Sequence, residues 1–254
     1  MHNPVAGLFF GSMLLIGLAL SPLTASGATG TDVQYVSAGV TVTGYLTMPD
    51  AHGSFPAIVA IHGWWGLNDW MRRSADRLAD EGYIVLAVDL FREKTPANAE
   101  EAHRLSRSLS GEQAIGDLMV AVAYLKSRED IRDGKFAAVG WSMGGGYALT
   151  MALTVPDLAA CVISYGRLVT ERASIEKIVC PILGIFGEDD RSIPTRSVQA
   201  FGDACSDAGK SADIQIYPDV GHSFMNENEK RSYNLEASSQ AWTRIVSFLD
   251  RTMK

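Results

Sequence analysis

The sequence contains few cysteines, and they do not describe a disulfide framework. The 254 residues include only 3 Cys, at positions 161, 180 and 205, an odd number without paired spacing. Cys161 and Cys180 open two short apolar segments, where a free cysteine packs as a small hydrophobic residue. A disulfide between them would require the two segments to be neighbouring strands, which the sequence leaves open.

Positive charge is also scarce. The chain has 22 Lys and Arg against 29 Asp and Glu, a net charge of −7, so its surface offers no excess of cations to a phosphate backbone. The G-x-G-x-x-G pattern and the P-loop lysine of nucleotide sites are missing, as are the ordered His and Cys spacings of a metal site. We therefore expect no nucleic-acid partner, no metal and no organic cofactor.

The N-terminal segment lacks charged side chains altogether. No Lys, Arg, Asp or Glu precedes Asp32, and residues 5–20 are almost wholly apolar. This pattern predicts a signal peptide over residues 1–28, cut after the small residues Ser26-Gly27-Ala28, and an exported protein that is periplasmic or extracellular. The usual positive charge near the N-terminus is absent, so an uncleaved membrane anchor is the alternative. After cleavage we expect no membrane association.

The rest of the chain, residues 29–254, is predicted to form one α/β domain. Apolar segments too short for helices alternate with segments whose apolar residues recur three and four apart, which favours parallel strands, right-handed crossovers and helices on both faces of a twisted sheet. Residues 33–37 and 41–48 alternate as an antiparallel edge hairpin does. The predicted strands are 57–61, 83–88, 136–139, 161–165, 182–186 and 214–217, and the predicted helices are 70–81, 115–127, 145–154, 195–208 and 237–253.

One polar stretch, residues 92–110, is predicted as an insertion above the carboxyl ends of the strands. Ligands of open α/β sheets bind at that edge. Because no larger insertion is present, we expect a fairly open site.

The most informative motif is Gly140-Trp141-Ser142-Met143-Gly144, which lies between a predicted strand and a predicted helix. This is the context of a nucleophile elbow, in which a serine occupies a sharp turn and its hydroxyl projects above the sheet. Gly140 and Gly144 provide space where a Cβ would strike the neighbouring backbone. The alternative is an ordinary glycine-rich turn, such as those that cradle phosphates, but the residues of such loops are absent.

A serine nucleophile needs a histidine base and a carboxylate, in the chain order Ser, acid, His. His222 is the only histidine that follows Ser142, and it lies just beyond the last predicted strand. The acid is expected after the strand 182–186, where Asp189 and Asp190 both occur. Spacing alone does not separate the two.

An oxyanion requires two backbone N–H donors, of which one belongs to the residue after the nucleophile, Met143. The other is expected in the loop His62-Gly63-Trp64-Trp65-Gly66, and we assign it to the Trp64 amide. Trp64 and Trp65 either line a substrate pocket or cover the first helix. Two adjacent exposed indoles are unfavourable, so at least one is expected to line the site.

These features together resemble the α/β-hydrolase superfamily and, within it, the dienelactone hydrolase family. The resemblance runs from about Phe55 to the C-terminus. Beyond the elbow it is carried by Trp65-Gly66-Leu67-Asn68, Glu81-Gly82-Tyr83, Val88-Asp89-Leu90-Phe91, Ser164-Tyr165-Gly166, Gly187-Glu188-Asp189-Asp190 and Gly221-His222-Ser223-Phe224.

The resemblance implies roles for individual residues. The family's Gly-x-x-Asp pattern falls on Gly187 and Asp190, which selects Asp190 as the acid, and its oxyanion position falls on Trp64. Residues expected to contact substrate are Trp65, Arg92, Tyr165 and Phe224.

Two departures distinguish this chain from the namesake enzymes. Those use a cysteine at the elbow and a glutamate in the oxyanion loop, where this chain has Ser142 and Gly63. The arginines that hold the carboxylate of dienelactone are replaced by Asn226 at one position and only approximated by Arg92 at the other. Dienelactone itself is therefore not the expected substrate.

The sequence thus predicts a hydrolase of carboxylic esters or lactones that forms a serine acyl-enzyme through Ser142, His222 and Asp190. Its substrate is a small molecule. The alternatives are a cofactor-free perhydrolase or acyl transferase with the same triad, and a binding protein on the same fold without turnover.

Overall fold

The computed structural model describes residue 1 and residues 27–254. The predicted signal peptide, apart from residues 1, 27 and 28, therefore lies outside the described residues. None of the helices in the described part of the chain is both long and apolar enough to span a membrane.

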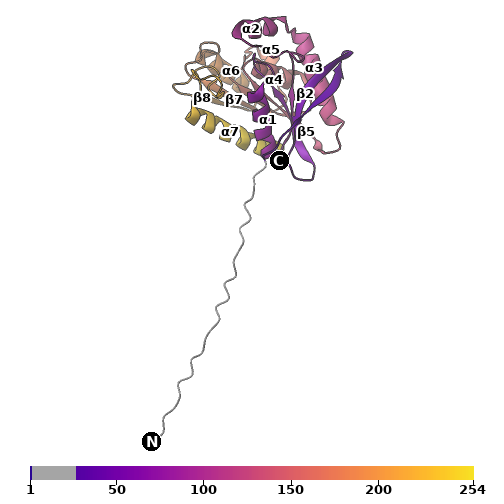
Figure 1. Cartoon of the computed structure of the whole chain (residues 1–254). Coiled ribbons are helices and arrows are strands. Elements are labelled where there is room, and N and C mark those ends of the chain that lie inside the picture. The colour runs from indigo at the N-terminus through magenta and orange to yellow at the C-terminus, as the bar shows by residue number, and fades with distance from the viewer. Residues whose placement is uncertain (2–26) are drawn as a thin grey trace.

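The described residues form an eight-stranded sheet in the order β1-β2-β4-β3-β5-β6-β7-β8 (Figure 1). β1 pairs with β2, and β2 with β4, in antiparallel fashion, whereas the pairs from β4 through β8 are parallel. This confirms the mostly parallel α/β sheet with an N-terminal antiparallel hairpin. The strands are β1 (Thr31–Ser37), β2 (Val40–Thr47), β3 (Phe55–Ile61), β4 (Ile84–Val88), β5 (Ile131–Trp141), β6 (Leu158–Ser164), β7 (Ile182–Gly187) and β8 (Ala212–Tyr217).

Helices cover both faces of the sheet, and each face has its own apolar core. α1 (Asp69–Asp80) and α7 (Leu235–Met253) pack on one face through side chains such as Leu78 and Ile245. The other face is covered by α3 (Gly111–Lys126), α4 (Met143–Thr154) and α6 (Thr195–Asp207). In the central strand β3, every residue from Ala57 to Ile61 is fully buried, as expected for a parallel strand between two helical layers.

Two helices were not predicted. α2 (Ala99–Ser108) occupies most of the stretch expected to be a polar insertion, and α5 (Arg172–Ile175) is a single turn. α2 begins at Asn98, whose side chain accepts a hydrogen bond from the Glu101 amide at 3.0 Å, and it buries Ala102 and Leu105. An N-cap asparagine followed by two apolar residues three positions apart was therefore a usable helix signal.

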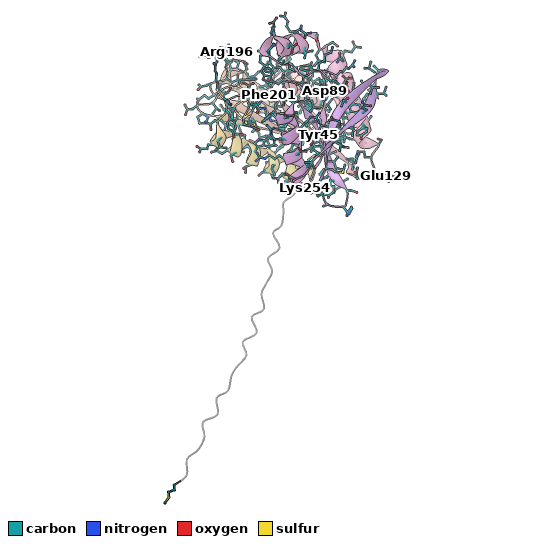
Figure 2. All side chains as sticks on the ribbon, in the orientation of Figure 1. Tyr45, Asp89, Glu129, Arg196, Phe201 and Lys254 are labelled. Atoms are coloured by element: carbon teal, nitrogen blue, oxygen red, sulfur yellow. The ribbon has the colours of Figure 1, made fainter. Side chains whose placement is uncertain are left out.

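The two ends of the described body lie side by side. The Ala28 amide donates to Asp80 Oδ1 at 2.7 Å, and Lys254 Nζ donates to the Glu81 carbonyl at 2.7 Å, so both ends contact the C-terminal end of α1. Figure 2 shows Lys254 and Glu129, which precedes β5, towards one end of the molecule and Arg196, which follows β7, towards the other. The carboxyl ends of the parallel strands therefore lie away from Lys254.

The turn between β5 and α4 is exceptionally tight. A Cβ placed on Gly140 would lie 2.1 Å from the Gly144 carbonyl oxygen, and one placed on Gly144 would lie 2.1 Å from the Ile61 carbonyl oxygen. A Cβ placed on Gly145 would lie 2.9 Å from the Cα of Gly166. These contacts are with backbone, so a larger residue cannot be accommodated by a side-chain rotation.

We expect Gly140→Ala to lower the free energy of unfolding by about 1–3 kcal/mol, because the added methyl group would displace the start of α4. Urea denaturation followed by circular dichroism measures this change. Gly111→Ala is the matched control, since a Cβ there meets nothing within 4 Å. Equal stability losses in the two variants would contradict the importance of this close approach.

Candidate active site

Ser142 lies at the turn between β5 and α4 in a left-handed conformation, with φ 55° and ψ −117°. Such a conformation costs a non-glycine residue on the order of 1–3 kcal/mol and persists only where its surroundings enforce it. Here the Ser142 amide donates to the Ser164 carbonyl at 2.9 Å, and the Gly145 amide donates to the Ser142 carbonyl at 3.0 Å. The hydroxyl is thereby directed towards His222, in front of the N-terminus of α4.

Ser142, His222 and Asp190 form a continuous hydrogen-bonded line. Ser142 Oγ lies 2.8 Å from His222 Nε2, and His222 Nδ1 lies 2.7 Å from Asp190 Oδ2. The side chain of Asp190 is buried and that of His222 is 30% exposed. Asp189, which spacing alone did not separate from Asp190, is exposed. The structure thus places Asp190, and not its neighbour, against the imidazole.

Asp190 is held in its ionised form by its hydrogen-bond donors. Burial alone would raise the pKa of Asp190, but the hydrogen bond and charge of His222 and the amides of Ile193 and Ser192 together lower it below the usual value. Its Oδ1 accepts from the Ser192 amide at 2.7 Å and from the Ile193 amide at 3.0 Å. Both carboxylate oxygens therefore accept hydrogen bonds, which fix the orientation of the carboxylate and stabilise its ionised form.

A cavity of about 520 Å³ opens in front of Ser142. Its wall combines aromatic and apolar side chains with a few polar groups, which is typical of a small-molecule site. The lining residues include Trp64, Met143, Tyr147, Tyr165, Arg167, Ile193 and Glu229.

The two amides assigned to an oxyanion hole are available. In the described part of the chain, neither the Trp64 N–H nor the Met143 N–H donates to a protein acceptor. Both residues line the cavity together with Ser142, and Met143 opens α4, where N–H groups lack helical partners and the helix dipole favours negative charge. Two unpaired donors beside a nucleophile can stabilise a negatively charged oxygen.

Two of the predicted substrate contacts lie at the site. The Tyr165 ring lines the cavity, and its centroid lies 5.2 Å from that of the His222 ring. Trp65 packs against Trp64, with ring centroids 5.3 Å apart, and its Nε1 donates to Glu229 Oε1 at 2.5 Å. Trp65 borders a second, smaller hollow behind Ser142 that Asn226 also lines.

The other two predicted contacts, like Trp65, do not line the cavity in front of Ser142. Arg92 is directed away from it because its guanidinium pairs with the buried carboxylate of Asp117 on α3, with Nη2 3.1 Å from Oδ1. Phe224 is fully buried beneath Tyr165, with the ring centroids 5.8 Å apart. Phe224 therefore supports a cavity residue, and Arg92 satisfies a buried acid. Neither residue lines the cavity in front of Ser142.

Several cavity residues were missed by the sequence analysis. Tyr147 lies one helical turn after Met143, so their shared face on α4 was a usable signal. Arg167 follows the end of β6 and is exposed at the cavity. Ser106 and Glu229 come from segments whose course the sequence did not predict, and no local pattern identifies them.

The three cysteines are free and buried. β6 and β7 are neighbours, and Cys161 pairs in register with Ile182, so the adjacency required for a Cys161–Cys180 disulfide exists although the thiols remain separate. Burial raises the pKa of Cys180 to about 12 and that of Cys205 to about 11. Within the described residues, no group of three or more His, Cys, Asp or Glu side chains could hold a metal ion.

Comparison with known proteins identifies the family of the chain. The profile of the dienelactone hydrolase family matches residues 42–253. The chain belongs to the dienelactone hydrolase family. A relative from Saccharolobus solfataricus, described as "Putative carboxymethylenebutenolidase", is 30% identical over 88% of this chain and 99% of its own. A relative from Methylorubrum extorquens with the same description is 27% identical over 90% of this chain and 86% of its own.

Solved structures of this family share the fold. A structure described as a "Putative Dienelactone Hydrolase" from Klebsiella pneumoniae superposes with a TM-score of 0.79 at 25% identity, covering 87% of this chain and 97% of the other. A dienelactone hydrolase-like promiscuous phosphotriesterase from metagenomic libraries has a TM-score of 0.82 at 22% identity, covering 90% and 100% of the two chains. The chain is thus a dienelactone hydrolase-like hydrolase.

The lowered pKa of Asp190 predicts a pH-dependent contribution to stability. A carboxyl whose pKa is lower in the folded state stabilises the fold above its unfolded value of about 3.9, and this contribution is lost as the pH falls through the folded value. We expect Asp190→Asn to lower the free energy of unfolding by about 1–3 kcal/mol at pH 7, with a smaller difference from the native protein at pH 3. Urea titrations at both pH values measure this.

The matched control is Asp189→Asn, because Asp189 is the exposed neighbour of Asp190. It should leave stability nearly unchanged at both pH values. A difference for Asp190→Asn that does not shrink in acid would contradict the stabilising role of its ionised form.

Proposed function

We propose that this dienelactone hydrolase-like protein cleaves carboxylic esters or lactones through a serine acyl-enzyme. The observation that carries the proposal is the hydrogen-bonded line from Ser142 Oγ through His222 to Asp190. Beside it lie two amides that have no acceptor among the described residues. A nucleophile, a base, an orienting acid and an oxyanion site in one cavity are the components that acyl transfer needs.

In the proposed reaction, Ser142 Oγ bonds to the substrate carbonyl carbon while its proton passes to His222 Nε2. Asp190 stabilises the resulting imidazolium, and the Trp64 and Met143 amides bind the negatively charged oxygen. Collapse of the tetrahedral intermediate breaks the bond to the alcohol oxygen, which takes the proton from Nε2. Water then attacks the acyl-enzyme by the same route, releasing the acid and restoring Ser142.

The serine nucleophile and the position of Arg92 both distinguish this protein from an enzyme that hydrolyses dienelactone with a cysteine. A serine hydroxyl needs a neutral imidazole to remove its proton, whereas a cysteine can react as a preformed thiolate. The Arg92 guanidinium is engaged by Asp117 and does not line the cavity, so it is not available to hold a substrate carboxylate. We therefore propose esters and lactones other than dienelactone as the first substrates to test, both uncharged and acidic ones, because the Arg167 guanidinium is exposed at the cavity.

We expect the native protein to take up one fluorophosphonate group, detected by intact mass, and to hydrolyse a short activated ester. In Ser142→Ala, labelling should disappear and kcat should fall by at least about 1,000-fold, because the nucleophile is lost. Ser239→Ala is the matched control, since Ser239 is exposed on α7, and it should retain both labelling and hydrolysis.

Other outcomes would change the assignment. A label on both the native protein and Ser142→Ala would mean that another residue is the nucleophile. Neither labelling nor hydrolysis in the native protein would favour a binding protein on this fold. If added peroxide or alcohol diverts most of the product to peracid or to a new ester, the protein is a perhydrolase or an acyl transferase.

We also propose that the protein is exported and that its leader is removed. The support is the uncharged apolar segment before Asp32. We expect the mass of the protein recovered from the native host to correspond to residues 29–254. The full-length mass in a membrane fraction would instead indicate an uncleaved anchor. A chain that begins at Thr29 would lack the hydrogen bond between the Ala28 amide and Asp80. The measured mass therefore also shows whether the mature protein retains this contact.

A further inference from the structure

A second histidine, His62, begins the oxyanion loop, residues 62–66, and takes no part in the proposed triad. It directly follows β3 and is only 1% exposed. Its Nδ1 lies 2.6 Å from the Gly63 carbonyl oxygen, and its Nε2 lies 3.1 Å from the Leu90 amide nitrogen. The ring also packs against Phe91, with centroids 4.9 Å apart. Both ring nitrogens therefore form hydrogen bonds with backbone groups of the protein.

These contacts determine the tautomer of His62. The Leu90 N–H can only donate, so Nε2 must be unprotonated, and the single proton of a neutral ring is then on Nδ1, where it donates to the Gly63 carbonyl. Burial lowers the pKa of His62, and the Gly63 carbonyl and Asp89 oppose this only in part. The Asp89 carboxylate approaches the ring no closer than 3.9 Å, from Oδ1 to Nε2. The ring is thus a neutral bridge.

The Gly63 carbonyl is directly coupled to the Trp64 amide because both belong to one planar peptide group. In a trans peptide the C=O and N–H bonds point in opposite directions, so fixing the carbonyl fixes the N–H. The Gly63 carbonyl also accepts from the Gly66 amide at 3.2 Å. A Cβ on Gly63 would lie 3.4 Å from the Cβ of Ser142, which places this peptide group directly against the nucleophile.

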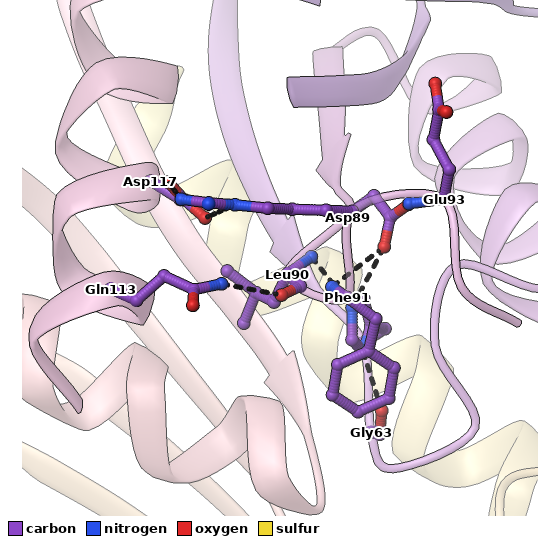
Figure 3. Close-up of polar contacts among 9 residues, drawn as sticks. Gly63, Asp89, Leu90, Phe91, Glu93, Gln113 and Asp117 are labelled. Atoms are coloured by element: carbon purple, nitrogen blue, oxygen red, sulfur yellow. Dashed lines mark hydrogen bonds and ion pairs between the residues drawn. The ribbon is translucent and has the colours of Figure 1, made fainter. Parts of the chain in front are cut away.

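The other end of the bridge is anchored in the turn after β4, drawn in Figure 3. The Asp89 carboxylate accepts from the Phe91 amide at 3.0 Å and from the Glu93 amide at 2.5 Å. The Leu90 carbonyl accepts from Gln113 on α3 at 3.4 Å. The Arg92–Asp117 pair provides a further attachment to α3. These contacts fix the position of the Leu90 amide, so its hydrogen bond to His62 can hold the oxyanion loop in place.

We propose that His62 is a positioning residue that orients the Trp64 amide towards the oxyanion, by holding the Gly63 carbonyl on the opposite side of the same peptide group. This inference rests on the proposed function, because the direction of the Trp64 N–H affects the rate only if that amide binds the oxyanion.

Two substitutions separate the two halves of the bridge. The amide nitrogen of asparagine occupies nearly the position of Nδ1 and can donate to the Gly63 carbonyl, whereas the amide oxygen of glutamine reaches towards Nε2 and can accept from Leu90. We expect His62→Gln to lower kcat about 100-fold with KM changed less than about 3-fold, since one oxyanion donor contributes roughly 100- to 1,000-fold. His62→Asn should retain kcat within about 10-fold of the native protein.

The controls are His52→Asn and His52→Gln, because His52 is an exposed loop residue, and both should match the native protein. Thermal unfolding is measured for every variant. If His62→Asn and His62→Gln lose kcat equally and in proportion to their melting temperatures, His62 is merely structural and the inference fails. Unchanged kcat in both also overturns it. An inactive, unlabelled native protein would instead show that the proposed function has failed.

A measurement on the native protein keeps the inference testable if the variants do not fold. In uniformly ¹⁵N-labelled protein, we expect His62 Nδ1 to be protonated and Nε2 to be unprotonated, with a scalar coupling between Nε2 and the Leu90 amide nitrogen. A protonated Nε2 would overturn the bridge, because it could not accept from Leu90.

Discussion

The close approach of α4 to the ends of β3 and β6 is the constraint on which the site depends. Gly140, Gly144 and Gly145 each face backbone atoms at distances that leave no space for a side chain. This approach brings the start of α4 beneath Ser142 and enforces its left-handed conformation. It also presses the oxyanion loop after β3 against the same turn. The nucleophile and its two candidate amide donors are therefore positioned by a single backbone contact region.

Two imidazoles flank this region and differ in what their hydrogen-bond partners allow. His222 Nδ1 faces a carboxylate and its Nε2 faces a hydroxyl, so the ring can accept a proton and remain stabilised. His62 Nδ1 faces a carbonyl and its Nε2 faces an amide N–H, so a second proton would have no acceptor. The same residue type thus serves as a proton carrier on one side of Ser142 and as a rigid spacer on the other.

The sequence predicted features that depend on local patterns, but it did not predict those that depend on contacts between segments distant in the sequence. The sheet, the elbow and His222 were predictable because strand periodicity, glycine spacing and chain order are local or ordered properties. Asp189 and Asp190 could not be separated by spacing, since what distinguishes them is the turn that brings the Ser192 and Ile193 amides onto one carboxylate. The ion pair of Arg92 was not predictable because its partner, Asp117, is a buried acid on a separate helix. The helix α2 was missed because only two buried apolar residues mark it.

Ala28, which precedes the proposed mature N-terminus at Thr29, and Lys254 both contact the C-terminal end of α1, so the two ends of the mature chain lie close together. A short linker could join these ends, and new termini could be opened in an exposed loop far from the cavity, so the protein is a suitable scaffold for circular permutation. Because the ends lie opposite the carboxyl edge of the sheet, attachment to a surface through either end would leave the cavity facing the solution.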